Sequence, residues 1–332
     1  MDHVQTVNGP VSLSELGCIL PHEHVTFYFD KHDMANRGIA EDFFVPLYQR
    51  LVQKYDCNAI LEATPRRVTD GYCKRKVPAH TQRTDYEVLQ TISRRSGMHI
   101  IASTGYYVEA SRPESFQAMT VAQLADGMIA DITQGMDDTG IRAGIIKIAV
   151  DSIESASDRK LMEAAAIASK QTGAAITTHT CSPEIRLDTL NFLEKAGALP
   201  SRIYLGHADA NSSLDEAMML AGRGCNLLYT IWGITNPRLI GWRGSKVPRY
   251  FSSYLLRALI DEGYAGQVLA SVDFNTNIYD GVLHQDVYEI PERTSAYAFT
   301  FIKPSLKRLG LDETVWNQIM RENPRRMLTI ES

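Results

Sequence analysis

Cysteine is scarce in this chain, and its spacing follows no known framework. The 332 residues include five cysteines, at Cys18, Cys57, Cys73, Cys181 and Cys225. Their number is odd, their positions are scattered, and no Cys-x-x-Cys pair occurs. This pattern argues against a disulfide-stapled secreted domain and against a thiolate metal cluster. It predicts free thiols in a reducing compartment.

Long apolar runs and an excess of basic residues are also lacking. No apolar stretch approaches the ~20 residues that a membrane-spanning helix needs. The amino-terminal segment MDHVQTVNGP lacks the basic start and apolar core of a signal peptide. A net charge of −5 argues against a nucleic acid or an anionic membrane as partner. We therefore expect a soluble, cytoplasmic protein that acts on a small molecule.

Short apolar runs recur along the chain, each followed by a segment of helical periodicity. The runs are nearly continuous in apolar residues, as strands are when crossover helices bury both faces of a sheet. The strands are expected at 17–22, 58–62, 99–103, 144–149, 175–178, 203–206, 226–229 and 268–272. The helical segments include 85–95, 121–134, 158–171, 183–196, 213–222 and 250–262.

Eight such strand-and-helix units in a chain of this length predict a (β/α)8 TIM barrel, an α/β fold with its active site at the carboxyl ends of the strands. A doubly wound sheet is the alternative, but no Gly-x-Gly-x-x-Gly turn follows the first strand. Neither a linker, nor a low-complexity tract, nor a short internal repeat marks a boundary. Residues 1–332 are therefore expected to form a single domain.

Residues that bind metals occur at the expected strand ends. In the stretch ILPHEHV, His22 and His24 stand two apart, so a β-strand would point both imidazoles to one face. His179, His207 and Asp273 end other strands. Taken singly, each could cap a helix or bond a loop amide. Together, four imidazoles and a carboxylate at one end of a barrel predict a divalent metal site.

Lys147 is unusual because it lies in an apolar strand, GIIKIA. A charged lysine inside a barrel is costly, and an outward lysine with its stem along a helix is the alternative. Burial lowers the pKa of a lysine, so that the amine can be neutral. A neutral amine can add carbon dioxide to form a carbamate, whose two oxygens could bridge two metals.

These residues and their neighbours resemble the phosphotriesterase-like family, the phosphotriesterase/lactonase branch of the amidohydrolase superfamily. The matching motifs follow one another nearly from end to end of the chain: Gly9-Pro10, Leu16-Gly17, Pro21-His22-Glu23-His24, Ser103-Thr104-Gly105-Tyr106-Tyr107, Gly144-Ile145-Ile146-Lys147-Ile148-Ala149, Thr178-His179, Gly206-His207, Ser271-Val272-Asp273 and Glu322-Asn323-Pro324-Arg325-Arg326. Any one of them would be weak evidence, whereas all of them in order are specific.

The resemblance implies a ligand set for two divalent ions. His22, His24 and Asp273 would hold the more buried ion, His179 and His207 the more exposed one, and carbamylated Lys147 would bridge both. Zinc is the first candidate, and manganese, iron and cobalt also suit these ligands. A hydroxide bridging the two ions would attack the substrate, and Asp273 would accept its proton. The resemblance also implies a homodimer.

Four further residues are candidates for binding the substrate. Tyr107 stands where lactonase members of the family have a tyrosine near the metals, although a core aromatic is the alternative. Trp232 follows the seventh strand and could form an apolar wall. Arg66 and Arg243 belong to segments 65–83 and 231–250, which are rich in basic residues. If both segments cover the active site, they predict a substrate with a carboxylate or phosphate; the alternative is a solvated loop.

Three functions remain open at this point. The first is hydrolysis of a lactone or other carboxylic ester by the two metals. The second is hydrolysis of an N-acyl amide, or of a phosphotriester, by the same site. The third is a catalytically idle barrel that binds metal, which the complete ligand set argues against. Ile231 stands where family members often have a basic residue, and segment 65–83 is longer than usual, so a standard lactone or phosphotriester substrate does not follow.

Overall fold

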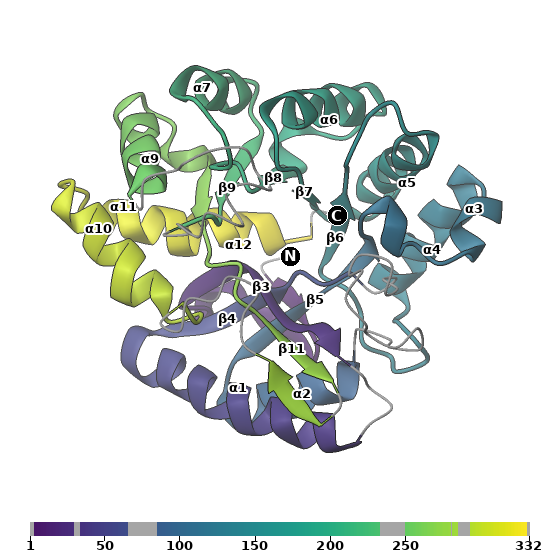
Figure 1. Cartoon of the computed structure of the whole chain (residues 1–332), viewed down its shortest axis with the longest axis horizontal. Coiled ribbons are helices and arrows are strands. Elements are labelled where there is room, and N and C mark those ends of the chain that lie inside the picture. Colours follow the sequence, from purple (N-terminus) through teal and green to yellow (C-terminus); the bar gives the residue numbers. More distant parts are fainter. Residues whose placement is uncertain are drawn as a thin grey trace.

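The computed structural model describes residues 3–29, 34–65, 85–232, 250–279, 281–284 and 293–330. Parallel strands lie at the centre and helices surround them (Figure 1). The strands follow one another in chain order around the sheet. They are β3 (Cys18–Phe29), β4 (Cys57–Glu62), β5 (His99–Tyr106), β6 (Ile145–Ala149), β7 (Ile176–His179), β8 (Ile203–Gly206), β9 (Asn226–Tyr229) and β10 (Val268–Ala270).

Hydrogen bonds between β3 and the residues that follow β10 close the sheet. The backbone nitrogen of Asp273 donates to the carbonyl oxygen of His22 at 3.0 Å, and that of His24 donates to the carbonyl oxygen of Phe274 at 2.8 Å. The chain then continues as β11 (Asn275–Tyr279), which pairs in parallel with β3, and β12 (Val282–His284), which pairs antiparallel with β11. The expected TIM barrel is thereby confirmed.

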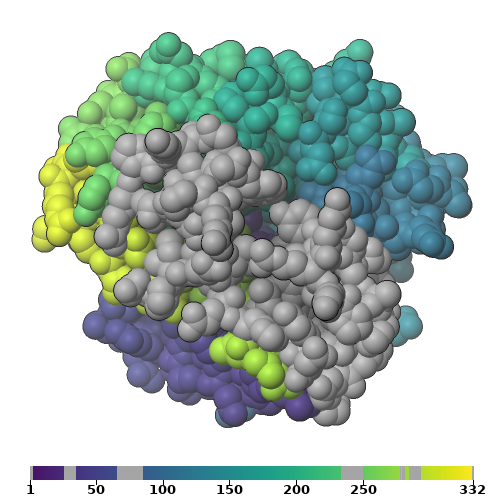
Figure 2. Space-filling model, in the orientation of Figure 1, coloured from purple at the N-terminus to yellow at the C-terminus, as the bar shows by residue number. Residues whose placement is uncertain are grey.

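Helices with well-defined ends surround the strands. The longer ones are α1 (Met34–Tyr55), α2 (Tyr86–Ser96), α4 (Val121–Thr133), α5 (Ala156–Thr172), α6 (Pro183–Lys195), α7 (Leu214–Gly222) and α9 (Phe251–Asp261). Side chains such as those of Asp85, Ser155 and Ser213 accept hydrogen bonds from the first turns of α2, α5 and α7. In the space-filling view, α5 to α7 (teal to green) lie along one side of the molecule and α1 (purple) along the opposite side (Figure 2).

Apart from α3, the remaining elements lie near the two ends of the chain. β1 (His3–Thr6) and β2 (Gly9–Ser12) form an antiparallel hairpin. The short helices are α3 (Ser115–Ala118), α10 (Lys303–Arg308), α11 (Glu313–Asn317) and α12 (Asn323–Leu328), and π-helical turns precede α10 and α12. An isolated bridge joins Val4 of β1 to Thr329, so the two ends of the described chain lie side by side.

Two apolar layers follow from the alternation of side chains along the strands. The inner one combines alternate strand residues with side chains from β1 and α12: Val4, Leu16, Ile19, Ala59, Leu61, Ala63, Ile101, Ile145, Ala175, Tyr204, Leu228, Leu269, Met327 and Leu328. The outer one lies between strands and helices and includes Ile146 and Ile148. Because Ile145 belongs to the inner layer and Ile146 and Ile148 to the outer one, Lys147 points into the barrel.

Two sequence-based expectations concern composition. The four cysteines within the described residues, Cys18, Cys57, Cys181 and Cys225, are free. Among the helices of the described segments, none combines the length and the apolar character needed to cross a bilayer.

Candidate active site

A register shift in β3 turns its two histidines toward the barrel axis. Ile19 belongs to the inner layer and Leu20 to the outer one, so regular alternation would point His22 outward. The pairing of β3 with β4 shifts between Leu20 and Glu23. This irregularity moves His22 and His24 to the inner face, as a β-bulge does when it re-aims a side chain. Both imidazoles are buried.

The carboxylate of Asp273 lies beside both of these histidines. One of its carboxylate oxygens, Oδ1, is 3.3 Å from Nε2 of His24 and 3.6 Å from Nε2 of His22. Burial opposes ionisation, but the hydrogen bond from His24 and the charges of His207 and His22 outweigh it, so the pKa of Asp273 is well below its usual range. The carboxylate is therefore ionised and able to bind a cation.

Lys147 is fully buried beside His22. Its Nζ lies 3.3 Å from Nε2 of His22 and 3.4 Å from the carbonyl oxygen of Thr178. Burial lowers the pKa of Lys147 to about 8, and the charge of Asp273 opposes part of that shift. The alternative of an outward lysine is wrong. The amine has the desolvated setting that carbamate formation requires, although the carbamate itself stays a prediction.

His179 and His207 form a second pair next to the first group. Nδ1 of His179 lies 2.8 Å from Nε2 of His207 and 3.2 Å from the hydroxyl of Tyr107. His207 and Asp273 both have left-handed backbones, with φ of 56° and 55°. Such conformations cost about 1–3 kcal/mol in residues other than glycine, and they cluster at functional sites.

Hydroxyl groups fix the orientation of two of the imidazoles. Nδ1 of His24 is 2.8 Å from the hydroxyl of Thr64, and Nδ1 of His207 is 2.6 Å from that of Thr230. If each Nδ1–H donates to its threonine, the Nε2 lone pair is left facing the centre of the site, as a metal ligand requires. Asp209 holds Thr230 in place by accepting from its backbone nitrogen at 3.0 Å.

Two groups of ligand atoms are close enough to hold metal ions, and they share one residue. His22, His207 and Asp273 form one group, and His179, Cys181 and His207 form the other; within each, the ligand atoms lie within 4.8 Å of one another. Nδ1 of His22 is buried and has no hydrogen-bond partner among the described residues. A core histidine satisfied by its neighbours would not show this arrangement, so the residues fit two adjacent metal ions.

Several supporting residues escaped sequence analysis because their roles depend on contacts across the barrel. Glu23 accepts from the Ser271 and Ser295 hydroxyls and the Val272 nitrogen, and burial raises its pKa to about 7. Glu62 accepts from the backbone nitrogen of Thr64 at 3.0 Å. Neither carboxyl belongs to the two groups of candidate metal ligands. For Glu23, the position between His22 and His24 in the sequence was the signal that could have identified it.

The structure describes two of the four candidate substrate-binding residues, Tyr107 and Trp232. Tyr107 is buried and contacts His179, as described above. Trp232 is fully buried, and its indole nitrogen donates to the carbonyl oxygen of Tyr229 at 3.0 Å. Its assignment as an apolar wall stays a prediction. Arg66 and Arg243 lie outside the described residues, and so do residues 66–83 and 233–249 of the basic segments to which they belong.

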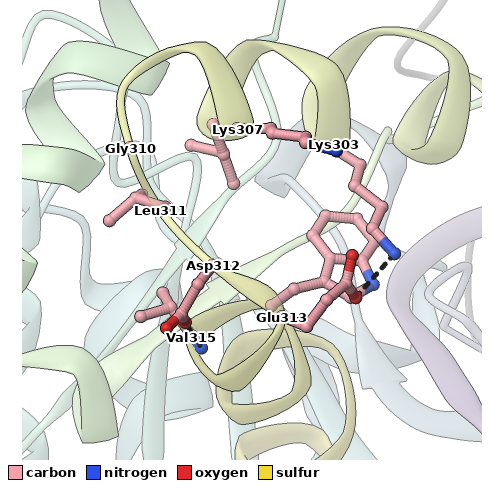
Figure 3. A pocket seen from close by; sticks show the side chains of 9 residues that line it. Lys303, Lys307, Gly310, Leu311, Asp312, Glu313 and Val315 are labelled. Atoms are coloured by element: carbon pink, nitrogen blue, oxygen red, sulfur yellow. Dashed lines mark hydrogen bonds and ion pairs between the residues drawn. The ribbon is translucent and has the colours of Figure 1, made fainter.

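A separate hollow of about 340 Å³ lies among the carboxyl-terminal helices. Its lining residues come from α10, α11 and the turn between them. Lys303 and Glu313 point toward each other on one side of it (Figure 3), with Nζ 2.8 Å from a carboxylate oxygen. Since none of the metal-site residues lines this hollow, it is distinct from the candidate active site.

Comparisons with known proteins agree with this geometry. The model of the phosphotriesterase family matches residues 2–328. An N-acetyltaurine hydrolase from Rattus norvegicus is 29% identical, and the match covers 99% of this chain and 98% of the relative. A phosphotriesterase homology protein from Escherichia coli is also 29% identical, over 70% of this chain and 75% of its own length.

A solved structure has the same fold. A mutant of an organophosphorus hydrolase from Deinococcus radiodurans superposes with a TM-score of 0.81 and covers 98% of this chain and 97% of its own. The two sequences are 24% identical.

Proposed function

Because the chain belongs to the phosphotriesterase family and is a hydrolase, we propose that it uses two divalent metal ions to hydrolyse an N-acyl amide that carries an anionic group. The observation that supports the metal site is the pair of adjacent ligand groups at the carboxyl ends of the strands. The observation that supports an amide is the match to N-acetyltaurine hydrolases over nearly the full length of both chains.

The proposed ligands divide between the two ions. His22, His24 and Asp273 would hold the inner ion, and His179 and His207 the outer one. Lys147, as a carbamate, would supply an oxygen to each. When bound, two such ions polarise the scissile carbonyl and lower the pKa of water. Zinc is the first candidate, because imidazole and carboxylate are its ordinary ligands.

Two side chains of the site would act on the reacting groups. Asp273 is ionised and touches both histidines of β3, so its carboxylate can accept the proton of the attacking water and pass it to the leaving amine. Tyr107 lies beside His179, where its hydroxyl can donate a hydrogen bond to the substrate's carbonyl oxygen. A developing negative charge on that oxygen would strengthen the bond.

An anionic substrate is supported independently by two observations. N-acetyltaurine, the compound in the relatives' name, carries a sulfonate. The sequence places Arg66 and Arg243 in segments rich in basic residues, which a barrel would carry at the carboxyl ends of its strands. An arginine fork suits the oxygens of a sulfonate as it suits those of a carboxylate or phosphate.

Hydrolysis of a lactone or other carboxylic ester is the second candidate. It is favoured by Tyr107, which stands near the metal site as a tyrosine does in the lactonases that the sequence resembles. The ligand set would serve either bond, because one metal pair can act on several leaving groups.

A matched set of substrates tests the proposal. We expect kcat/KM of the zinc-loaded protein to be highest for an N-acetylated amino sulfonate or amino acid. It should be lower for the same amide with the anionic group replaced by a methyl group, and this preference should weaken with added salt. A γ-lactone and a phosphotriester complete the set. Faster hydrolysis of the lactone, unaffected by salt, would replace the first candidate by the second.

Metal analysis tests the site itself. The loaded protein should contain two ions per chain, and His207→Ala should lose metal and activity together. Because Tyr254 is exposed and belongs to none of the metal groups, Tyr254→Ala serves as the control that keeps both. One ion or none per chain in the loaded wild type would contradict the dinuclear site.

A further inference from the structure

A sulfur atom lies beside the outer pair of histidines. Cys181 follows β7, two residues beyond His179, and its side chain is half-buried. Its Sγ lies 3.4 Å from Nε2 of His179. With His207, these residues form the second of the two groups whose ligand atoms lie within 4.8 Å of one another. The sequence predicts only that the five cysteines are free thiols.

The separation of sulfur and nitrogen matches that of two ligands on one ion. A tetrahedral zinc ion lies about 2.0–2.1 Å from a histidine nitrogen and about 2.3 Å from a cysteine sulfur. Two such ligands are then ~3.5 Å apart, close to the 3.4 Å between Sγ of Cys181 and Nε2 of His179. Because Nε2 of His207 faces the other ring nitrogen of His179, Nδ1, binding of one ion by all three side chains requires a rotation of the His179 ring. A hydrogen bond between a neutral thiol and the imidazole would give a similar distance, and the experiment below distinguishes the two.

The other described cysteines have different surroundings. Cys57 and Cys225 are fully buried, and burial raises the pKa of both thiols, that of Cys225 to about 12. The thiol of Cys225 donates to the carbonyl oxygen of Leu220 at 3.0 Å, so it already has a partner. Cys225 precedes β9, at the opposite end of the barrel from the metal site. It therefore provides a control cysteine.

We propose that Cys181 is a sulfur ligand of the outer metal ion, beside His179 and His207. This inference rests on the proposed metal site and adds a ligand to it. On binding, the thiol would lose its proton to solvent, because the deprotonated sulfur is the ligand. A site with one sulfur favours zinc, cobalt and cadmium over manganese and magnesium, which prefer oxygen ligands.

Cobalt(II) provides a direct readout, because a cobalt–sulfur bond gives a charge-transfer band in the near ultraviolet that nitrogen and oxygen ligands do not give. Titration of the metal-free protein with cobalt should produce this band together with the visible cobalt bands. Cys181→Ser should keep the visible bands and lose the charge-transfer band. Cys225→Ser and Cys73→Ser should keep both; Cys73 lies outside the described residues, and its variant tests it as an alternative source of sulfur.

Metal competition supplies a second measurement. Cys181→Ser should lose affinity for zinc by at least about 10–100-fold, since loss of even an outer-shell partner of a metal ligand typically costs that much. Its affinity for manganese should change much less, because manganese gains little from sulfur. An equal loss for both metals would indicate a hydrogen-bonding role and would overturn the proposal.

The possible failures are distinguishable. A wild-type protein that binds no cobalt would contradict both the proposed function and this inference. Cobalt bound without a charge-transfer band, or with a band that survives in Cys181→Ser, would overturn the sulfur ligand alone. If Cys181→Ser does not fold, alkylation of the wild type decides: bound zinc should protect Cys181 from iodoacetamide, and equal labelling with and without zinc would refute its ligation.

Discussion

The amine of Lys147 lies among imidazole and apolar groups rather than in water, and this setting determines what it can bind. Its neighbours in β6 alternate between the two apolar layers, so the strand holds the amine beside His22. We expect Lys147→Ala to lose metal and nearly all activity. A short carboxylic acid supplied with metal should restore part of the activity, because it can replace the carbamate. Lys170→Ala, at an exposed position of α5, should behave like the wild type.

The pH dependence of reactivation follows from the same residue. The pKa of Lys147 is lowered from 10.5 to about 8, so its neutral amine predominates above that pH and the ammonium below it. Only the neutral amine adds carbon dioxide. For metal-free protein given metal and a fixed concentration of dissolved carbon dioxide, the initial reactivation rate should rise by about tenfold per pH unit and level off above about 8. A rise that continues to about pH 10 would contradict a lowered pKa.

In the proposed mechanism Asp273 is both a metal ligand and a proton acceptor, and one substitution can separate these two roles. An amide oxygen can still bind a metal, but an amide cannot accept the proton. Asp273→Asn should therefore keep much of its metal and lose turnover by about 10²–10⁴-fold, the usual range for proton transfer by a side chain. Metal content and kcat should be measured on the same sample. Turnover near the wild-type value at full metal occupancy would show that another group takes the proton.

At the scale of elements, strand and helix positions were largely predictable and the exceptions have physical reasons. Six helices lie within two residues of the expected ranges, because caps such as Asp85 and Gly97 fix their ends. Helix α1 was missed because Pro46 in its interior reads as a break. The register shift that turns His22 inward depends on β4, which sequence periodicity does not reveal. Cys181 was missed because the turn after β7, which brings its sulfur beside the ring of His179, cannot be read from sequence periodicity.

Glycine at position 105 permits the close contact of β5 with β6 beside Lys147. A Cβ atom at Gly105 would lie 2.0 Å from the carbonyl oxygen of Lys147, and φ is +112°. Gly105→Ala should destabilise the fold by about 3 kcal/mol or more and reduce metal content, because overpacking adds to backbone strain. Gly97→Ala is the matched control. It also has positive φ but open space around it, so roughly 1–2 kcal/mol is expected. Equal losses in a denaturant titration would contradict the steric argument.

At the scale of the whole molecule, Arg202 ties the carboxyl terminus to the barrel. It is buried and donates to the carbonyl oxygens of Arg326 at 2.8 Å and Thr329 at 2.6 Å. Arg202→Met should keep the packing of the stem and destabilise the protein by roughly 3 kcal/mol, since each buried acceptor left without a donor costs about 1–3 kcal/mol. Turnover of the folded fraction should not change, because these contacts lie at the other end of the barrel.

Arg223→Met provides the comparison for this prediction. Arg223 pairs with Glu194 at the surface, and such pairs contribute about 0–1 kcal/mol. Its loss should therefore be small in the same denaturant titration. An equal loss of stability in both variants would show that the hydrogen bonds of Arg202 stabilise the fold no more than a surface ion pair does.

The bridge between Val4 and Thr329 has a consequence for biosynthesis. The inner layer beneath the metal site combines Val4 of the first strand with Met327 and Leu328 of the last helix. During translation, β1 can pair with β2 at once, but its bridge to Thr329 and its packing against α12 form only after residues 323–329 have left the ribosome. Until then the growing barrel exposes an apolar interior to water, and such surfaces attract chaperones and proteases. The proposed metal ligands, which run from His22 of β3 to Asp273 after β10, are thus all synthesised before the end of the barrel beneath them can close.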